Sequence, residues 1–140
     1  MILDCLSNGA NNMLRNIFVL LILSVFVVCS VEAADLSVAD AVITTAIEKQ
    51  MPVDEIEVYP ADFGKLYCFT RIVGADKETK VTHVWYYQDD ELARVELQVG
   101  SSDWRTYSSK RFLPQWAGKW RVVILDEEGQ QLASVPFRLE

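Results

Sequence analysis

Alternation of apolar and polar residues between Lys80 and Val99 constrains the fold more than any other feature of this chain. From Ala93 to Val99, apolar residues occupy every second position and polar residues the positions between them. A period of two places one face of a β-strand against a core and the other in solvent. The acidic stretch from Gln88 to Glu91 supplies a turn between Lys80–Tyr87 and Leu92–Val99, so the sequence predicts an antiparallel hairpin.

The same rhythm of short strands and turns continues on both sides of this hairpin. Strands are expected at residues 56–59, 65–73, 80–87, 92–99, 104–110, 120–126 and 132–139. Their number and spacing predict an all-β domain over residues 55–140, an immunoglobulin-like antiparallel β-sandwich of about seven strands. Asp35 to Gln50 instead carries a partly apolar helical stripe that ends before Pro52, so residues 34–54 are predicted to form a short helix and linker.

The N-terminal residues have the features of an export signal. Arg15 precedes an apolar run from Ile17 to Val28, and small residues around Ala33 suit a cleavage site there. Residues 1–33 are therefore predicted to be a signal peptide, with Met13 as a possible true start. The protein is then expected to be periplasmic or secreted. The alternative is an uncleaved segment that anchors the chain in the membrane, although the run is short for a span.

Charge and cysteine content exclude some functions. The net charge is −7, which disfavours nucleic acid as a partner because nucleic acid selects basic surfaces. After cleavage Cys68 is the one cysteine left, so no internal disulfide is possible, and its apolar neighbours predict a buried thiol.

The residues with the greatest chemical potential divide between core and surface. His83 and Trp85 share a face of one predicted strand, and Trp120 lies on the apolar face of another, so these residues are predicted to be structural. His83 is the only histidine, and a metal site needs three or four ligands. We therefore expect no metal, no cofactor and no catalytic residue; an enzyme that uses His83 with Ser108 is the weaker alternative.

The segment from Trp104 to Lys110 carries the candidate binding residues. One interpretation is a ligand platform on which an aromatic ring stacks against a sugar while cationic and hydroxyl groups donate hydrogen bonds. The other is that Trp104 packs in the core and Arg105 forms an ion pair. Trp116 lies in a predicted loop, where it can cover the core or anchor a partner. The candidates are Trp104, Arg105, Tyr107, Ser108, Lys110 and Trp116.

Several motifs together resemble a known family. They are Cys-Phe-Thr (68–70), Thr-His-Val-Trp-Tyr-Tyr (82–87), Trp-Arg-Thr-Tyr-Ser-Ser-Lys (104–110) and Gly-Lys-Trp-Arg-Val (118–122). Over residues 55–140 this combination is similar to DUF2914, a bacterial domain family of unknown function. The resemblance implies a β-sandwich in the cell envelope and implies no activity.

Together these features predict a non-enzymatic periplasmic module that binds a protein partner or an envelope glycan. The glycan alternative uses exposed aromatic residues. Contact with the membrane is expected only through the N-terminal segment, if that segment stays uncleaved.

Overall fold

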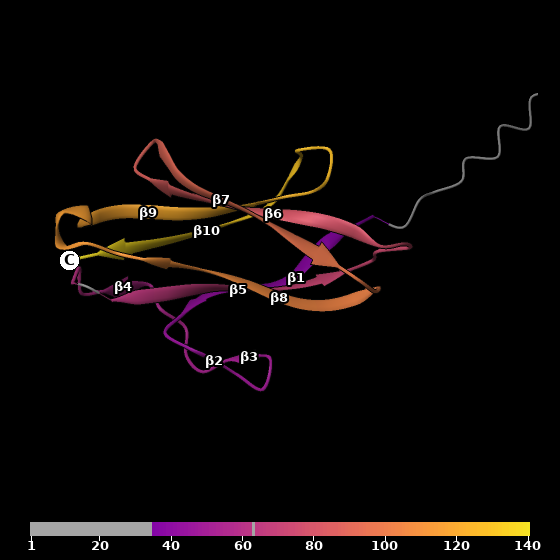
Figure 1. The fold of residues 1–140 in the computed structure, drawn as a ribbon, viewed down its shortest axis with the longest axis horizontal. Helices are drawn as coiled ribbons and strands as arrows, with labels where there is room; N and C mark the ends of the chain where they lie inside the picture. The colour runs from indigo at the N-terminus through magenta and orange to yellow at the C-terminus, as the bar shows by residue number, and fades with distance from the viewer. Residues whose placement is uncertain (1–34, 63) are drawn as a thin grey trace, which may run out of the picture. The chain divides into compact units, whose positions relative to one another are not determined.

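The computed structural model describes residues 35–62 and 64–140, and their regular structure is almost entirely β (Figure 1). The predicted signal peptide lies outside these residues, and within them no helix is long and apolar enough to cross a membrane. One short 3-10 turn, η1, spans Pro114–Trp116. The strands in this part of the chain are β1 (Ser37–Thr44), β2 (Ile47–Glu48), β3 (Met51–Pro52), β4 (Val58–Tyr59), β5 (Lys65–Val73), β6 (Thr79–Tyr87), β7 (Asp90–Val99), β8 (Asp103–Arg111), β9 (Gly118–Leu125) and β10 (Gln131–Leu139).

The strands form two larger sheets and one small hairpin. One sheet has the order β1-β5-β8, and the other has the order β4-β10-β9-β6-β7. Every pair is antiparallel except β4 with β10, which is parallel. Strands β2 and β3 pair only with each other. Figure 1 shows the two larger sheets as two layers, with the β2–β3 hairpin beyond the three-stranded layer.

The core lies between the two layers. In β5 the alternate residues Leu66, Cys68 and Ile72 are fully buried, and they face Trp85, Trp120 and other apolar residues of the five-stranded sheet. Burial of large side chains from both sheets is the main stabilising contribution, at roughly 25 cal/mol per Å² of apolar surface. The aromatic rings of this core also touch edge to face, for example Phe112 against Trp120 with centroids 4.8 Å apart.

The predicted helix at residues 35–50 is wrong, because residues 37–44 form strand β1. This strand pairs antiparallel with β5 and buries Val42, Ile43 and Thr44. A β-bulge between Val38 and Asp40 adds a residue, so the alternation that would reveal a strand is broken halfway along. The β-branched residues from Val42 to Thr45 favour a strand, and pairing with the open edge of β5 decides the outcome.

The other predicted strands agree with β5 to β10 to within two residues at each end. The first predicted strand, at residues 56–59, shrinks to the two residues of β4, since Pro60 follows directly and the pairing with β10 covers only Val58 and Tyr59. The prediction of an all-β chain is thus confirmed, while β1 adds a strand that the sequence pattern did not reveal.

Replacement of Ile43 by alanine tests whether β1 belongs to the folded core. Ile43 is fully buried, so Ile43→Ala should lower the free energy of unfolding by about 2–5 kcal/mol through lost burial and a residual cavity. Urea titration at neutral pH measures the change. Ala39→Ser, at an exposed position of the same strand, should change the value by less than about 0.5 kcal/mol. Equal stability of both variants would mean that residues 37–44 are only a linker.

Candidate functional site

Strand β8 carries most of the candidate binding residues, and the structure separates them by face. Ser108 points into the core and is 5% exposed, whereas Tyr107 on the opposite face is 48% exposed. Arg105 shares the outer face with Tyr107, since side chains alternate along a strand. Trp104, near the start of β8, is 37% exposed. β8 is an edge strand, so its outer residues border open solvent on one side.

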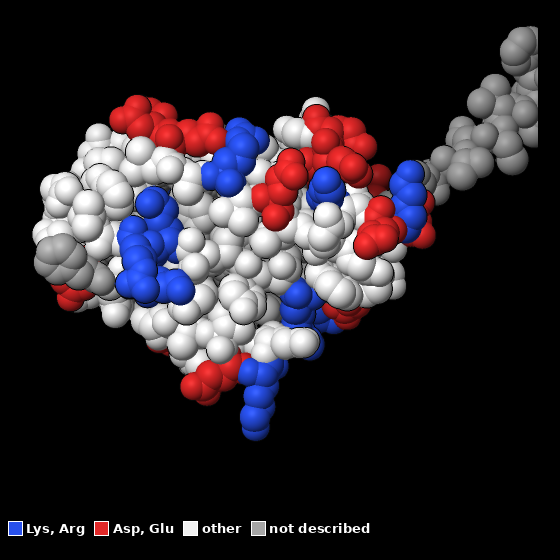
Figure 2. All heavy atoms as spheres, in the orientation of Figure 1, with Lys and Arg blue, Asp and Glu red and all other residues white. Residues whose placement is uncertain are grey.

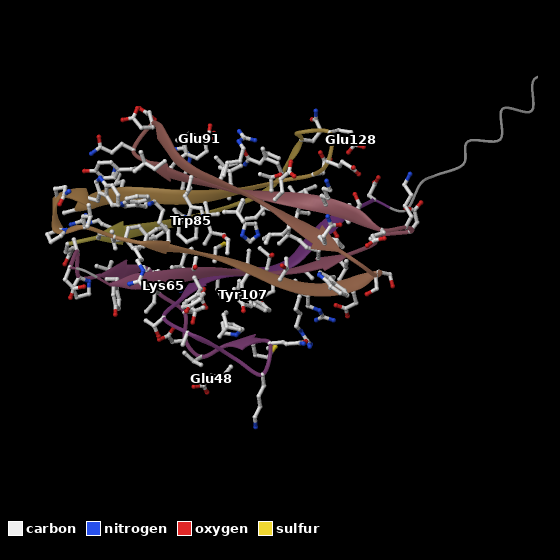
Figure 3. All side chains as sticks on the ribbon, viewed as in Figure 1. Glu48, Lys65, Trp85, Glu91, Tyr107 and Glu128 are labelled. Carbon is white, nitrogen blue, oxygen red and sulfur yellow. The ribbon has the colours of Figure 1, made fainter. Side chains whose placement is uncertain are left out.

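A groove forms where the β2–β3 hairpin reaches across the outer face of the three-stranded sheet. Its volume is about 580 Å³, and it is lined by Gln50, Phe69, Gln98, Trp104, Arg105, Thr106 and Tyr107. A second hollow of about 350 Å³ shares Gln50, Trp104 and Arg105 with it. Figure 3 shows Tyr107 on the layer from which the hairpin carrying Glu48 projects. The structure therefore brings Trp104, Arg105 and Tyr107 together around one concave surface, which we call the β8 groove.

The hairpin tip that borders the β8 groove has a strained backbone. Glu48 pairs with Met51, so Lys49 and Gln50 form a two-residue loop, and their φ angles are 52° and 61°. Positive φ at both central residues is the condition for a type I′ turn, which normally selects Asn-Gly. Two residues with long side chains in this conformation cost roughly 1–2 kcal/mol each. The strained turn places the Gln50 amide on the groove.

Charges near the groove are only partly balanced. Asp103 binds Arg71 through two hydrogen bonds, Nε to Oδ1 at 2.9 Å and Nη2 to Oδ2 at 2.6 Å, and this contact holds the pKa of Asp103 below its usual range. Arg105 lies directly opposite Arg71 in the β5–β8 register and forms no ion pair with the described residues. Its guanidinium can therefore donate to a ligand at this end of β8.

His83, the only histidine, lies in a buried polar cluster that connects the two sheets. Its Nδ1 is 2.7 Å from Ser108 Oγ, and its Nε2 is 3.1 Å from Thr70 Oγ1. Trp85 Nε1 donates to Ser108 Oγ at 3.1 Å, and Thr70 Oγ1 donates to the carbonyl of Thr106 at 3.3 Å.

The hydrogen count of this cluster fixes the direction of each bond. Thr70 uses its one proton toward Thr106, so it must accept from His83 Nε2–H. Ser108 accepts from Trp85 and therefore donates to His83 Nδ1, which must be unprotonated. The result is one continuous chain of donors from Trp85 to the backbone. It requires a neutral imidazole, in keeping with burial, which lowers the pKa of His83 to about 4.

The His83–Ser108 contact has the length of a base–nucleophile pair but not the surroundings of one. Both side chains are buried, and the second imidazole nitrogen meets the Thr70 hydroxyl where a triad would have a carboxylate. Neither residue lines a hollow that the structure describes. The geometry gives Ser108 a structural role beside His83, and its predicted place on the binding platform is not on the exposed surface.

Lys110 and Trp116 lie together, away from the groove. The Lys110 ammonium is 4.6 Å from the centroid of the Trp116 ring, and partial burial lowers the pKa of that lysine. The Trp116 ring meets Trp120 edge to face with centroids 6.1 Å apart, and the Trp116 carbonyl accepts the Trp120 indole N–H at 2.8 Å. Trp116 therefore covers the end of the core, and Trp120 and Cys68 lie inside it.

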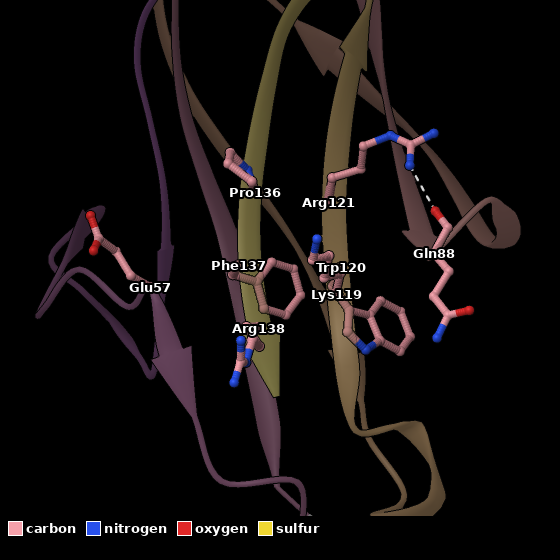
Figure 4. Close-up of a pocket in the computed structure, with 8 residues that line it drawn as sticks. All are labelled: Glu57, Gln88, Lys119, Trp120, Arg121, Pro136, Phe137 and Arg138. Atoms are coloured by element: carbon pink, nitrogen blue, oxygen red, sulfur yellow. Dashed lines mark hydrogen bonds between the residues drawn. The ribbon is translucent and has the colours of Figure 1, made fainter. Parts of the chain in front are cut away.

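A third hollow of about 520 Å³ lies on the five-stranded sheet (Figure 4). Trp120 and Phe137 border it but are almost wholly buried, so they offer little surface to a ligand. Arg121 donates from Nη1 to the Gln88 carbonyl at 2.7 Å, the bond dashed in Figure 4, and its guanidinium covers the Tyr86 ring at 4.3 Å. Because its aromatic rings are buried and Arg121 is already bound within the protein, this hollow is a weaker candidate than the β8 groove.

No group of three or more metal-binding side chains occurs among the residues that the structure describes. Four residues that line the groove are not among the predicted site residues: Gln50, Phe69, Gln98 and Thr106. Gln50 lies in the stretch predicted to be a helix, and Gln98 is an ordinary outward position of its predicted strand. The alternation of its strand predicts that Gln98 points outward. Only the fold brings Gln98 of β7 and Trp104 of β8 to the same groove.

The chain is thus an all-β domain of two facing sheets with an aromatic groove at one edge. A family model described as "Protein of unknown function (DUF2914)" matches residues 78–139, so this part of the chain is similar to that family. The match agrees with the resemblance predicted from the motifs, over a shorter stretch than the expected 55–140. The match covers β6 to β10 and includes Gln98 and Trp104 to Tyr107, whereas Gln50 and Phe69 lie outside it. No curated protein matches the chain.

The free energy of unfolding should fall as the pH is lowered from 6.5 to about 4, because His83 is buried in its neutral form. The folded-state pKa of about 4 lies below the ordinary value of 6.5, so the unfolded chain binds the extra proton as the pH falls through this range. The free energy of unfolding should be fully retained above pH 6.5 and fall by up to roughly 3 kcal/mol by pH 4, at about 1.4 kcal/mol per pKa unit. Urea titrations across this range measure the slope.

His83→Gln is the control for this slope, since it removes the only imidazole. The variant should be less stable at pH 7 but should lose little further stability down to pH 4. Asp54 and Asp103 have lowered pKa values, so their stabilisation is lost only below their ordinary value of 3.8, outside this window. An unchanged slope in the variant would assign the pH dependence to carboxylates and contradict the role of His83.

Proposed function

We propose that this chain is a non-enzymatic glycan-binding module and that the β8 groove is its binding site. The observation that carries the proposal is the grouping of two exposed aromatic side chains, Trp104 and Tyr107, with two Gln side chains and with Arg105, which forms no ion pair with a described residue, around one concave surface. Ligand sites commonly combine aromatic walls with a few converging polar groups.

The chemistry of these groups suits a sugar. The apolar face of a pyranose ring packs against an aromatic ring, which supplies contact area at small entropic cost. Arg105, Gln50 and Gln98 present planar groups with fixed donors, which match adjacent hydroxyl pairs. The strained turn that contains Gln50 supports a binding role for this groove, since backbone strain is commonly retained at functional sites.

A protein partner is the second candidate. Met51 and Val53, on and just after the β2–β3 hairpin, are 45% and 46% exposed. Apolar side chains exposed beside a groove are a common feature of protein interfaces. A partner that covered this hairpin would contact the same edge of the domain, so glycan binding and partner capture have to be measured side by side.

We also propose an immunoglobulin-like sandwich for the fold. The support is the strand order: β1-β5-β8 corresponds to A-B-E, and β10-β9-β6-β7 corresponds to G-F-C-C′. For the compartment we propose the cell envelope, after export by residues 1–33. The support is the apolar run from Ile17 to Val28 with Arg15 before it. A reporter fusion that is active only outside the cytoplasm tests export.

Loss of the Trp104 ring should abolish most of the binding. Trp104→Ala should weaken retention on glycans at least about tenfold, equivalent to roughly 1.4 kcal/mol, because it removes a stacking surface. The probes are peptidoglycan sacculi and a panel of neutral and anionic soluble polysaccharides. Leu92→Ala is the matched control, since Leu92 on β7 is 39% exposed and lies outside the groove. Absence of binding to every glycan, or equal binding by both variants, would overturn the proposal.

Glycine substitutions in the strained turn should change the free energy of unfolding and the affinity for glycan in different ways. Gln50→Gly should raise the free energy of unfolding by up to about 1 kcal/mol, since glycine adopts positive φ freely. The same change removes an amide from the groove, so glycan affinity should fall. Lys49→Gly relieves similar strain outside the groove and should keep full affinity. A Gln50→Gly variant that binds as tightly as the parent would show that the amide makes no contact with the ligand.

A further inference from the structure

Three pairs of cations lie directly opposite each other on neighbouring strands. They are Lys65 with Arg111, Arg71 with Arg105, and Lys119 with Arg138. Like charges in directly opposed positions of a sheet destabilise it by a few tenths of a kcal/mol or more. A nearby anion would stabilise such a pair.

In two of the three pairs, one of the two cations binds an anion within the protein, and the other cation forms no ion pair with a described residue. Asp103 binds Arg71 at 2.6 Å beside Arg105, and Glu140 binds Arg138 at 3.1 Å beside Lys119. Lys65 and Arg111 form no ion pair with any residue that the structure describes. Asp54, a carboxylate near the same sheet, is held by Thr44 and Thr45 at β1, the edge opposite to β8. Among the described residues, the Lys65–Arg111 pair thus has no ion-pair partner, although the net charge of the chain is −7.

This pair lies on the same face as the β8 groove. Arg105, Tyr107, Ser109 and Arg111 occupy successive outward positions of β8, and Lys65 and Tyr67 occupy the adjoining outward positions of β5. Six residues separate Arg105 from Arg111, about 20 Å along a strand. Between the two ends the surface is uncharged and partly aromatic, with Tyr67 and Tyr107 in edge contact at 5.8 Å between centroids. Figure 2 shows one face of the domain, on which groups of Lys and Arg are separated by uncharged surface.

We infer that the ligand of the β8 groove is an extended anionic polysaccharide, which lies along the outer face of β8 and places acidic groups at Arg105 and at the Lys65–Arg111 pair. This inference rests on the proposed glycan-binding function and adds the charge and the length of the ligand. The aromatic surface between the ends suits sugar rings, and the unneutralised cations suit carboxylates or phosphates. A neutral glycan would leave Lys65 and Arg111 unpaired, and a single acidic sugar would reach only one end.

The test uses the full chain, two polysaccharides that differ only in charge, and one phosphate polymer. The matched polysaccharides are polygalacturonate and its carboxyl-reduced neutral product, and the phosphate polymer is teichoic acid. We expect at least one of the two anionic polymers to bind on the order of tenfold more tightly than the neutral polymer, and affinity to fall steeply with added salt. Oligomers too short to reach from Arg105 to Arg111 should bind more weakly than long ones.

A double substitution locates the second contact. Lys65→Thr/Arg111→Thr should reduce affinity for the anionic polymer by on the order of tenfold and reduce the dependence on salt. Lys119→Thr/Arg138→Thr makes the same change in net charge at the opposed pair on the other sheet and should leave affinity within about twofold. Circular dichroism and urea titration establish that both variants fold.

The outcomes separate this inference from the proposed function. Binding that depends on Trp104 but is equal for neutral and anionic polymers, or unaffected by Lys65→Thr/Arg111→Thr, overturns the anionic ligand and keeps the glycan module. An equal loss in both double variants shows an effect of net charge alone and also overturns it. No binding to any polymer overturns both, and capture of an acidic protein in place of glycan favours the partner alternative.

Discussion

The buried chain of hydrogen bonds through His83 is the constraint on which the rest of the structure depends. It joins Trp85 and His83 of the five-stranded sheet to Ser108 and Thr70 of the three-stranded sheet, and no buried side-chain polar atom among the described residues lacks a partner. Apolar contacts allow sheets to slide, whereas a chain of directional bonds fixes one alignment. That alignment sets which residues of β8 face the core and which face the ligand.

The position of β8 follows from this alignment and explains the surface chemistry. Ser108 is held inward by the imidazole, so Arg105, Tyr107 and Arg111 must point outward along the same strand. Since β8 is an edge, its outward residues form a continuous surface that the β2–β3 hairpin narrows at one end. Core and candidate site are therefore two faces of one strand, and a shift of one residue in register would exchange them.

Charge balance distinguishes the two ends of that surface. At the groove end Asp103 binds Arg71 and leaves Arg105 without an ion pair, while at the other end neither Lys65 nor Arg111 forms an ion pair with a described residue. A domain with an acidic total charge can still present such a local cationic surface, because screening in solution limits the influence of distant carboxylates to about a Debye length. The family assignment of residues 78–139 adds no activity, so the argument for function rests on these side chains.

The sequence by itself determined the β class, the approximate limits of β5 to β10 and the inward face of β6, because alternation and turn residues are local signals. It failed at β1, where a bulge interrupts the alternation and pairing with β5 overrides a helical pattern. Only the tertiary structure decided that Ser108 lies inside while Trp104 stays exposed, and that Gln50 and Gln98 meet them at one groove. These outcomes depend on contacts between segments distant along the chain, which no local pattern records.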